Sequence, residues 1–264
     1  GDLREVDGRS IAVELNRSPR IRYDVAPSYF TSFVYLMDLF KESLKIKEFD
    51  MEAGVLERAI ETARWLEKNH EIYCLSYPGT FSYSDAESKR YPNEIRVPPL
   101  TFTPALNNDL IEPGFFATVT GIPGLERLYE NARRLGLKCY SNEPKAVPYS
   151  IFALPRIISN KNILFQFARS GWGSVWSSML SGTPLVTPPF DKSDDFEIYF
   201  NNLTIELLGI GLVDRGESIE ELGERFRKIR ESSLKKREGI LKRWQTLDGQ
   251  SLAAAVFAED FIKR

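Results

Sequence analysis

From Gly114 onward, short apolar runs rich in aromatic and β-branched residues alternate with longer segments of helical periodicity. This alternation restricts the fold more than any other feature of the sequence. The strand-like runs are 115–120, 137–140, 149–153, 164–168, 184–187 and 212–213, and the helix-like segments between them are 123–135, 172–180 and 196–208. Strands that alternate with helices indicate a parallel sheet covered on both faces. The predicted class is therefore α/β, closed by charged helical segments that follow Ser218 and end with 252–262.

The first hundred residues have a different pattern. Residues 29–45 and 51–69 each place apolar side chains on one helical face, which predicts two helices. Shorter strand candidates are 10–15, 20–25 and 71–75. Residues 77–103 are rich in Pro, Ser and Tyr and read as loop and linker. We therefore expect a partial N-terminal domain with its linker at 1–103 and a C-terminal domain at 104–264.

The charge balance excludes some classes of protein. Lys and Arg number 35 against 37 Asp and Glu, for a formal net charge of -2. A protein that coats nucleic acid needs an excess of basic residues, so we expect no nucleic-acid partner. The 17 Phe, 11 Tyr and 4 Trp argue against disorder. No apolar run is long enough to cross a bilayer and no signal segment opens the chain, so the expected location is cytoplasmic.

Cysteine and histidine, two common metal ligands, are scarce in this chain. Two cysteines, Cys74 and Cys139, cannot build a disulfide framework or a thiolate zinc site. The single histidine, His70, excludes a metal site made of several histidines. No Asp-x-Asp motif lies in a suitable loop. We expect neither a metal nor a bound cofactor.

The segment 169–174, Arg-Ser-Gly-Trp-Gly-Ser, lies directly between a predicted strand and a predicted helix. In open α/β sheets, ligands bind at the carboxyl ends of strands, where small residues and helix N-termini admit a phosphate. Arg169 could add a two-pronged contact to phosphate oxygens. Loop chemistry alone fits a tight turn equally well, in which Ser170 or Ser174 caps the helix and Trp172 packs in the core.

A longer sequence pattern favours phosphate binding over a simple tight turn. Residues 169–189 place the Gly-Trp-Gly-Ser turn before a helix, and Gly182-Thr-Pro184 then leads into a strand that ends at two prolines. This order resembles the donor-nucleotide segment of GT-B glycosyltransferases, the group of plant and macrolide UDP-sugar transferases and MurG. Residues 197–202 resemble that group's (Asp/Glu)-Gln-x-x-Asn-Ala helix, and 209–211 its Gly-x-Gly. Residues 96–100 resemble the element that enters the interdomain linker. The resemblance covers about residues 94–264.

The resemblance implies a GT-B fold and a metal-independent enzyme that transfers a sugar, with inversion, from a nucleotide-diphosphate sugar to an acceptor hydroxyl. A UDP-sugar is the expected donor. The implied diphosphate contacts are Arg169, Ser170, Gly171, Gly173 and Ser174, with Thr120 and Gly121 at the end of the first strand. Leu154 would lie at the nucleobase, Ser177 at the ribose, and Glu197 at the hydroxyls of the donor sugar.

Two positions depart from the family pattern. Ser177 stands where the family usually has a ribose-binding Glu, and Ile198 stands where it has a sugar-contacting Gln. Glu197 is also a residue type that helix N-termini favour without any ligand.

The catalytic base is not identified by the sequence. Inverting transfer needs a base for the acceptor proton, and the family's usual N-terminal histidine after a Gly-rich strand has no counterpart here. His70 follows a helix end, where it would complement the last carbonyls.

Three explanations stay open at this stage: a shortened chain, a split enzyme whose partner chain supplies the other half, or a non-catalytic relative. The alternative to a transferase is thus a binding module or one subunit of a split enzyme, and a nucleotide-sugar epimerase of GT-B fold is a third. The acceptor is not identified, and peripheral membrane association is expected only for a lipid acceptor.

Overall fold

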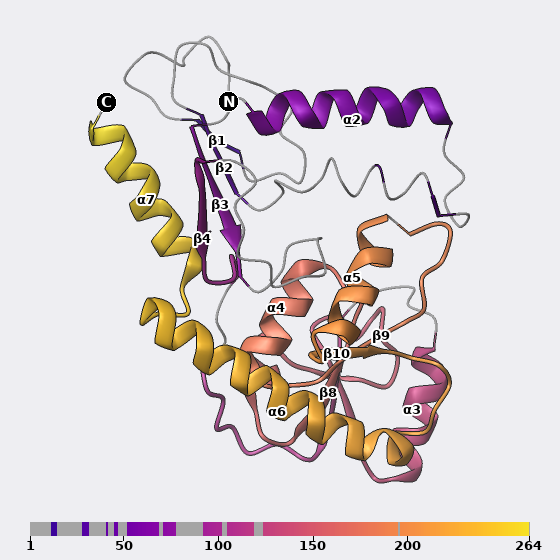
Figure 1. The fold of residues 1–264 in the computed structure, drawn as a ribbon. Helices are drawn as coiled ribbons and strands as arrows, with labels where there is room; N and C mark the ends of the chain where they lie inside the picture. The colour runs from indigo at the N-terminus through magenta and orange to yellow at the C-terminus, as the bar shows by residue number, and fades with distance from the viewer. Residues whose placement is uncertain are drawn as a thin grey trace. The chain divides into compact units, whose positions relative to one another are not determined.

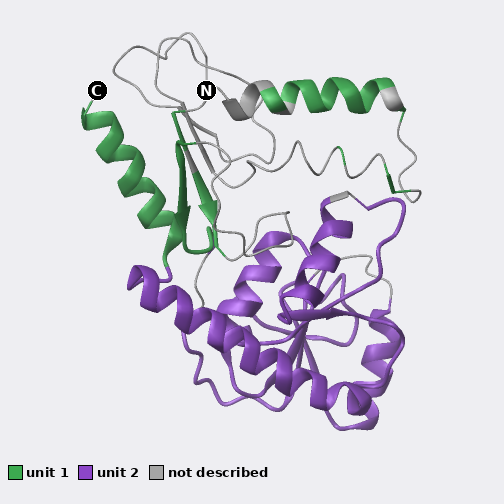
Figure 2. Cartoon of the chain, viewed as in Figure 1, with its two compact units in different colours: residues 1–100, 248–264 green, residues 101–247 purple. Residues whose placement is uncertain are grey.

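The computed structural model describes residues 12–14, 28–31, 41, 45–46, 52–68, 71–77, 92–101, 105–118, 124–194 and 196–263. The chain divides into two compact units (Figure 2). Unit 1 comprises residues 1–100 together with 248–264, and unit 2 comprises 101–247.

Unit 1 contains a parallel sheet in the strand order β1-β2-β3-β4 (Figure 1). The strands are β1 (Ala12–Glu14), β2 (Ser28–Thr31), β3 (Ile72–Ser76) and β4 (Glu94–Val97), and the helices are α2 (Ala53–Lys68) and α7 (Gly249–Lys263). Helix α7 packs on this sheet, where Ala253 and Phe257 form a core cluster with Cys74 and Val97.

Backbone contact fixes the start of α7. A Cβ on Gly249 would stand 2.0 Å from the carbonyl oxygen of Pro98, so only glycine fits this approach. By its contacts α7 belongs to unit 1, whereas the sequence pattern keeps it with the C-terminal part.

The N-terminal predictions hold in part. The helix predicted at 51–69 corresponds to α2, but the helix predicted at 29–45 is wrong at its start, because residues 29–31 lie in strand β2. Tyr29 and Phe30 pair with β3, and such aromatic residues favour a strand once a neighbour is available. Strand β4 lies inside the predicted loop 77–103. The strand predicted at 20–25 lies outside the described residues.

Unit 2 contains a six-stranded parallel sheet in the order β10-β9-β8-β5-β6-β7. Its strands are β5 (Gly114–Ala117), β6 (Lys138–Ser141), β7 (Ile151–Phe152), β8 (Ile163–Phe167), β9 (Leu185–Thr187) and β10 (Gly211–Val213). Its helices are α3 (Leu125–Arg134), the short 3₁₀ helix η2 (Pro155–Ser159), α4 (Trp172–Ser181), α5 (Phe196–Leu207) and α6 (Ile219–Trp244). The predicted α/β class is confirmed.

The side chains of β8 point to opposite faces of the sheet, and their contacts show which helices cover each face. Phe165 and Phe167 point into the main core, which also contains side chains of α3 and α6. Gln166, between them, faces the other way and accepts a 2.6 Å hydrogen bond from Ser178 of α4. On that second face η2 contributes Ile157 and Ile158 to a smaller cluster. Helices therefore cover both faces, as the sequence predicts.

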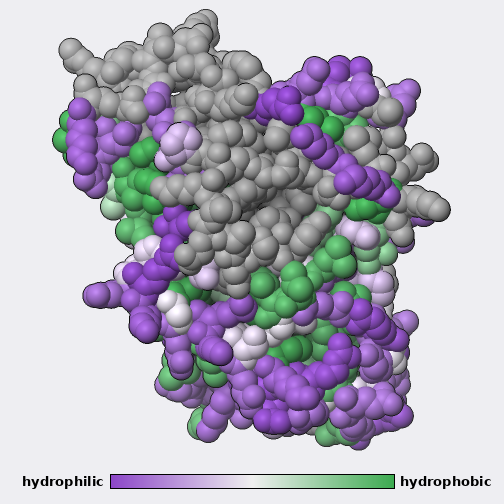
Figure 3. Space-filling view, viewed as in Figure 1, coloured by the Kyte–Doolittle hydropathy of each residue, from purple (hydrophilic) through white to green (hydrophobic). Residues whose placement is uncertain are grey.

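The charged run in α6 is a solvated helix face, as expected. Its apolar stripe, which includes Phe226, Ile229 and Ile240, is buried. On the exposed side, Arg227 bonds Glu224 and Glu231 at helical spacing. The space-filling view shows mostly hydrophilic surface over the lower part of unit 2, where α6 crosses (Figures 1 and 3).

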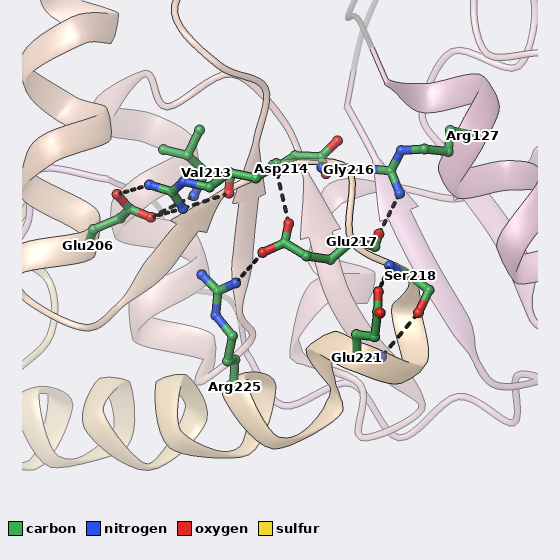
Figure 4. Close-up of polar contacts among 10 residues, drawn as sticks. Arg127, Glu206, Val213, Asp214, Gly216, Glu217, Ser218, Glu221 and Arg225 are labelled. Carbon is green, nitrogen blue, oxygen red and sulfur yellow. Dashed lines mark hydrogen bonds and ion pairs between the residues drawn. The ribbon is translucent and has the colours of Figure 1, made fainter.

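An ion-pair network surrounds the end of β10 (Figure 4). Arg215 makes two hydrogen bonds to the Glu206 carboxylate, at 2.7 and 2.8 Å. Asp214, buried, pairs with Arg127 of α3. The segment after β10 is thereby tied to α3 and α5, and a further bond from Arg225 to Glu217 ties it to α6.

Candidate functional site

The candidate site lies at the carboxyl ends of β8 and β9, where helices α4 and α5 begin. All six strands of this sheet are parallel, so their carboxyl ends share one edge. The loop 168–171 joins β8 to α4, and the segment 188–195 joins β9 to α5. Two hydrogen bonds join the first of these loops to α5: the Ser170 hydroxyl donates to Asn202, and Asn201 donates to the Ser170 carbonyl.

Among the described residues, no side chain caps the N-terminus of α4. Its N-cap residue is Gly171, and neither Ser170 nor Ser174 accepts a capping bond. The N–H groups of the first helical turn have no partner within the helix and lie at the positive end of its dipole. The turn interpretation is therefore wrong about the cap. It is right about Trp172, which is buried and stacks on Trp176 with ring centroids 5.0 Å apart.

Neither glycine of this turn is explained by packing. Gly171 has φ -60 and ψ 147, a conformation that any residue adopts. A Cβ on Gly171 or Gly173 would meet no atom within 4 Å among the described residues, apart from its chain neighbours and its own helix. Glycine inside a helix costs about 0.5–1 kcal/mol relative to Ala. Among the described residues, the space beside both glycines is therefore open, at the end of α4 where the first N–H groups lie.

Arg169 forms an ion pair at the edge of this space. Its guanidinium contacts the carboxylate of Asp194, whose side chain is only 4% exposed, whereas that of Arg169 is 38% exposed. Asp194 also accepts a 3.0 Å bond from the N–H of Asp191. An Arg side chain has five N–H donors, so the exposed part of Arg169 keeps donors for an anion. Hydrogen bonds from Ser193, with a smaller effect of the Arg169 charge, hold the pKa of Asp191 below its usual value.

Ser170 joins the loop to α5. It is fully buried, and its hydroxyl donates to Oδ1 of Asn202 at 2.6 Å. Its carbonyl accepts from Nδ2 of Asn201, also at 2.6 Å. The Ser170 hydroxyl hydrogen is thus already used, and the visible role of this residue is to fix the loop.

Glu197 lies in the first turn of α5, partly exposed, and accepts a 3.3 Å bond from Asn201. The next residue, Ile198, is buried. On α4, the Ser177 hydroxyl donates to the carbonyl of Gly173 at 2.7 Å, so it could still accept a bond from a ligand. The structure therefore brings Glu197 close to Arg169–Ser174 through Ser170 and Asn201.

Leu154 lies elsewhere in unit 2. It is half-exposed at the start of η2 and lines a cavity of 340 Å³ together with Phe152, Tyr140 and Arg156. The residues that line this cavity include none from 169–174. Thr120 and Gly121 lie outside the described residues, as does His70.

Sequence reasoning missed the supporting residues of the site. Asp194 follows the turn that Asp191 and Ser193 close, and nothing in its spacing assigns it to Arg169. The consecutive Asn201 and Asn202 did carry a signal, because amides are rare on the buried face of a largely apolar helix.

Two features are absent from the part of the chain that the structure describes. No three His, Cys, Asp or Glu residues there gather as a set of metal ligands would. No helix there has both the length and the apolar character that crossing a membrane requires.

This chain resembles known proteins in its structure and not in its sequence. No protein-family model matches the sequence, and no curated protein matches it. Apo UGT2 of Phytolacca americana aligns with a TM-score of 0.59 at 15% identity, covering 89% of this chain and 72% of that chain. A UDP-glucosyltransferase from Polygonum tinctorium, capable of glucosylating indoxyl, aligns with a TM-score of 0.58 at 16% identity, covering 90% and 71%.

A third solved structure agrees. CalG4, the calicheamicin glycosyltransferase, aligns with a TM-score of 0.57 at 15% identity, covering 90% of this chain and 68% of its own. At these identities the likeness establishes the fold alone. The chain has the fold of the GT-B glycosyltransferases, as the ordered motifs in its sequence predict.

Proposed function

We propose that this protein is a glycosyltransferase that transfers a sugar, with inversion, from a nucleotide-diphosphate sugar to an acceptor hydroxyl. The proposed donor is a UDP-sugar. The observation that carries the proposal is the N-terminus of α4, which no described side chain caps, with space at Gly171 and Gly173 that no described residue fills. An anion fits there because the N–H groups of the first helical turn have no partner within the helix and lie at the positive end of its dipole. The solved structures of similar fold include UGT2 of Phytolacca americana in complex with UDP-2-fluoro-glucose and LpCGTa in complex with UDP.

The proposal assigns each residue a role. The backbone at Gly171, Gly173 and Ser174 binds the diphosphate, and the exposed donors of Arg169 add charge. Glu197 accepts hydrogen bonds from the donor sugar, and Ser177 accepts one from the ribose. Leu154 remains the proposed nucleobase contact, and Thr120 and Gly121 remain proposed phosphate contacts. No bound cofactor is needed, and the reaction compartment is the cytoplasm.

The test is to fill the open space. Gly173→Leu adds a side chain where no described residue stands, so the variant folds and blocks the diphosphate. We expect the parent to bind UDP in isothermal titration calorimetry and Gly173→Leu to lose at least tenfold in affinity, about 1.4 kcal/mol. Gly223→Leu on α6 is the matched control, because a Cβ there also meets nothing within 4 Å. Equal affinity of the two variants, or no binding of UDP, GDP or dTDP by the parent, would contradict the proposal.

A non-catalytic binding module, or one subunit of a split transferase, is the second candidate. The buried Ile198 favours it, since that position offers the donor sugar no polar group. The two candidates differ in turnover. A transferase releases UDP from UDP-glucose when acceptors or water are supplied, whereas a module binds the donor and leaves it intact.

A further inference from the structure

The amide of Asn201 connects two parts of the proposed donor site. Asn201 is fully buried on α5, and its Nδ2 donates to the carbonyl of Ser170 at 2.6 Å and to Oε1 of Glu197 at 3.3 Å. Ser170 belongs to the loop that opens α4, and Glu197 is one turn earlier on α5. One side chain therefore reaches both the diphosphate loop and the carboxylate proposed for the donor sugar.

The orientation of this amide is determined by its partners. A carbonyl and a carboxylate only accept hydrogen bonds, so the NH₂ group must face both of them. As a result, Oδ1 of Asn201 is buried without a hydrogen-bond partner among the described residues. An unsatisfied buried acceptor costs about 1–3 kcal/mol, and a leucine of similar size would avoid that cost. The two donated bonds are what the amide gains in return.

The neighbouring Asn202 has a different set of contacts. Its Oδ1 accepts from the Ser170 hydroxyl at 2.6 Å, and its Nδ2 donates to the carbonyl of Pro188 at 3.3 Å. Both ends of this amide are satisfied, one by the loop before α4 and the other by the segment before α5. Asn202 therefore fixes the backbone of the site, whereas Asn201 additionally holds the Glu197 carboxylate.

We propose that Asn201 is a positioning residue for recognition of the donor sugar, an inference that rests on the proposed function. By holding Oε1 of Glu197 toward the Ser170 loop, it keeps the carboxylate at a fixed distance from a diphosphate bound at the N-terminus of α4. Once Oε1 is held, the orientation of the second carboxylate oxygen, Oε2, is restricted as well. The sugar and diphosphate parts of one donor thus meet groups whose separation is fixed.

The test compares two ligands, UDP and UDP-glucose, whose only difference is the sugar. Asn201→Leu should raise the ratio of the UDP-glucose Kd to the UDP Kd by roughly 3- to 10-fold, the size of one lost hydrogen bond. Asn202→Leu is the matched control: it loosens the shared loop, so both Kd values rise together and their ratio stays constant. Asn201→Ala serves as a second variant if leucine does not fit, with thermal unfolding to check that each variant is folded.

A double-mutant cycle tests the route through Glu197. Glu197→Ala should raise the same ratio, and Asn201→Leu added to Glu197→Ala should raise it no further. Independent effects of the two substitutions on the ratio, or a ratio unchanged in Asn201→Leu, would overturn the inference. A parent protein that binds neither ligand would instead overturn the proposed function, so the two failures are distinguishable.

Discussion

At the scale of single residues, the site is organised by side chains that the ligand itself would not touch. Asp194 holds Arg169, and Asn202 holds the hydroxyl of Ser170. Breaking a buried pair by removing one partner typically costs 3–5 kcal/mol, because the remaining charge is left uncompensated. The nearly buried Asp194 is therefore expected to keep Arg169 in place, and the exposed part of the guanidinium is what an anion can contact.

The contact between Arg215 and Glu206 gives a pH-dependent prediction (Figure 4). The hydrogen bonds from Arg215 lower the pKa of Glu206 from its usual 4.5, although partial burial opposes this shift. A carboxyl with a depressed folded-state pKa adds stability above its unfolded pKa and loses it as the pH falls through the folded value. Glu206→Gln should therefore lower the free energy of unfolding at pH 7 by about 0.5 kcal/mol, since half-exposed pairs contribute little.

The measurement is urea unfolding of the parent and Glu206→Gln at pH 7 and at pH 3. The difference in free energy between the two proteins should shrink at the lower pH. A difference in unfolding free energy that stays constant or grows as the pH falls would contradict the stabilising role of the pair between Glu206 and Arg215.

At the scale of elements, the start of α6 depends on a complete capping box. The Ser218 hydroxyl accepts from the N–H of Glu221, and the Glu221 carboxylate accepts from the N–H of Ser218. Ser218→Ala removes the first of these bonds and should cost about 1 kcal/mol of stability. Ser218→Asp retains an N-cap acceptor and should restore most of it. Chemical unfolding measures both variants, and equal stability of Ser218→Ala and the parent would refute the role of the cap.

The elements also show what sequence can and cannot predict. In unit 2 the apolar runs and helical periods predict every described strand to within a few residues, because most of these strands are short apolar runs buried in the sheet. The exposed edge strand β7 is the exception. In unit 1 the strand β2 was read as helix, since Tyr29 and Phe30 fit either period and only pairing with β3 decides. Periodicity cannot reveal such a long-range contact.

The candidate site divides in the same way. Its backbone part, Gly171 and Gly173, was predicted from the sequence by resemblance, and the structure places both glycines at the start of α4. Its side-chain part was not. The pairing of Arg169 with Asp194, and of Asn201 with Ser170 and Glu197, requires loops from two different strand ends to meet. That meeting is a property of the parallel sheet.

At the scale of the whole molecule, the chain contains separate cores, and each of its two cysteines belongs to a different one. Cys74 lies under α7 in unit 1, and Cys139 lies in the main core of unit 2. Burial raises the pKa of both thiols to about 12. Since the thiolate is the reactive form, neither native thiol should react with iodoacetamide at pH 8.

This separation predicts selective exposure of one thiol. Phe257→Ala removes the largest α7 side chain packed against Cys74, at a cost of about 3–5 kcal/mol to that core. Local opening then occurs in unit 1, so Cys74 is alkylated well before Cys139. Phe226→Ala, in the core that contains Cys139, is the reciprocal variant and should reverse the order. Mass spectrometry of the alkylated peptides measures both rates. If either variant exposed both thiols at the same rate, the cores would unfold as one cooperative unit, and the assignment of α7 to a separate core would lose its energetic meaning.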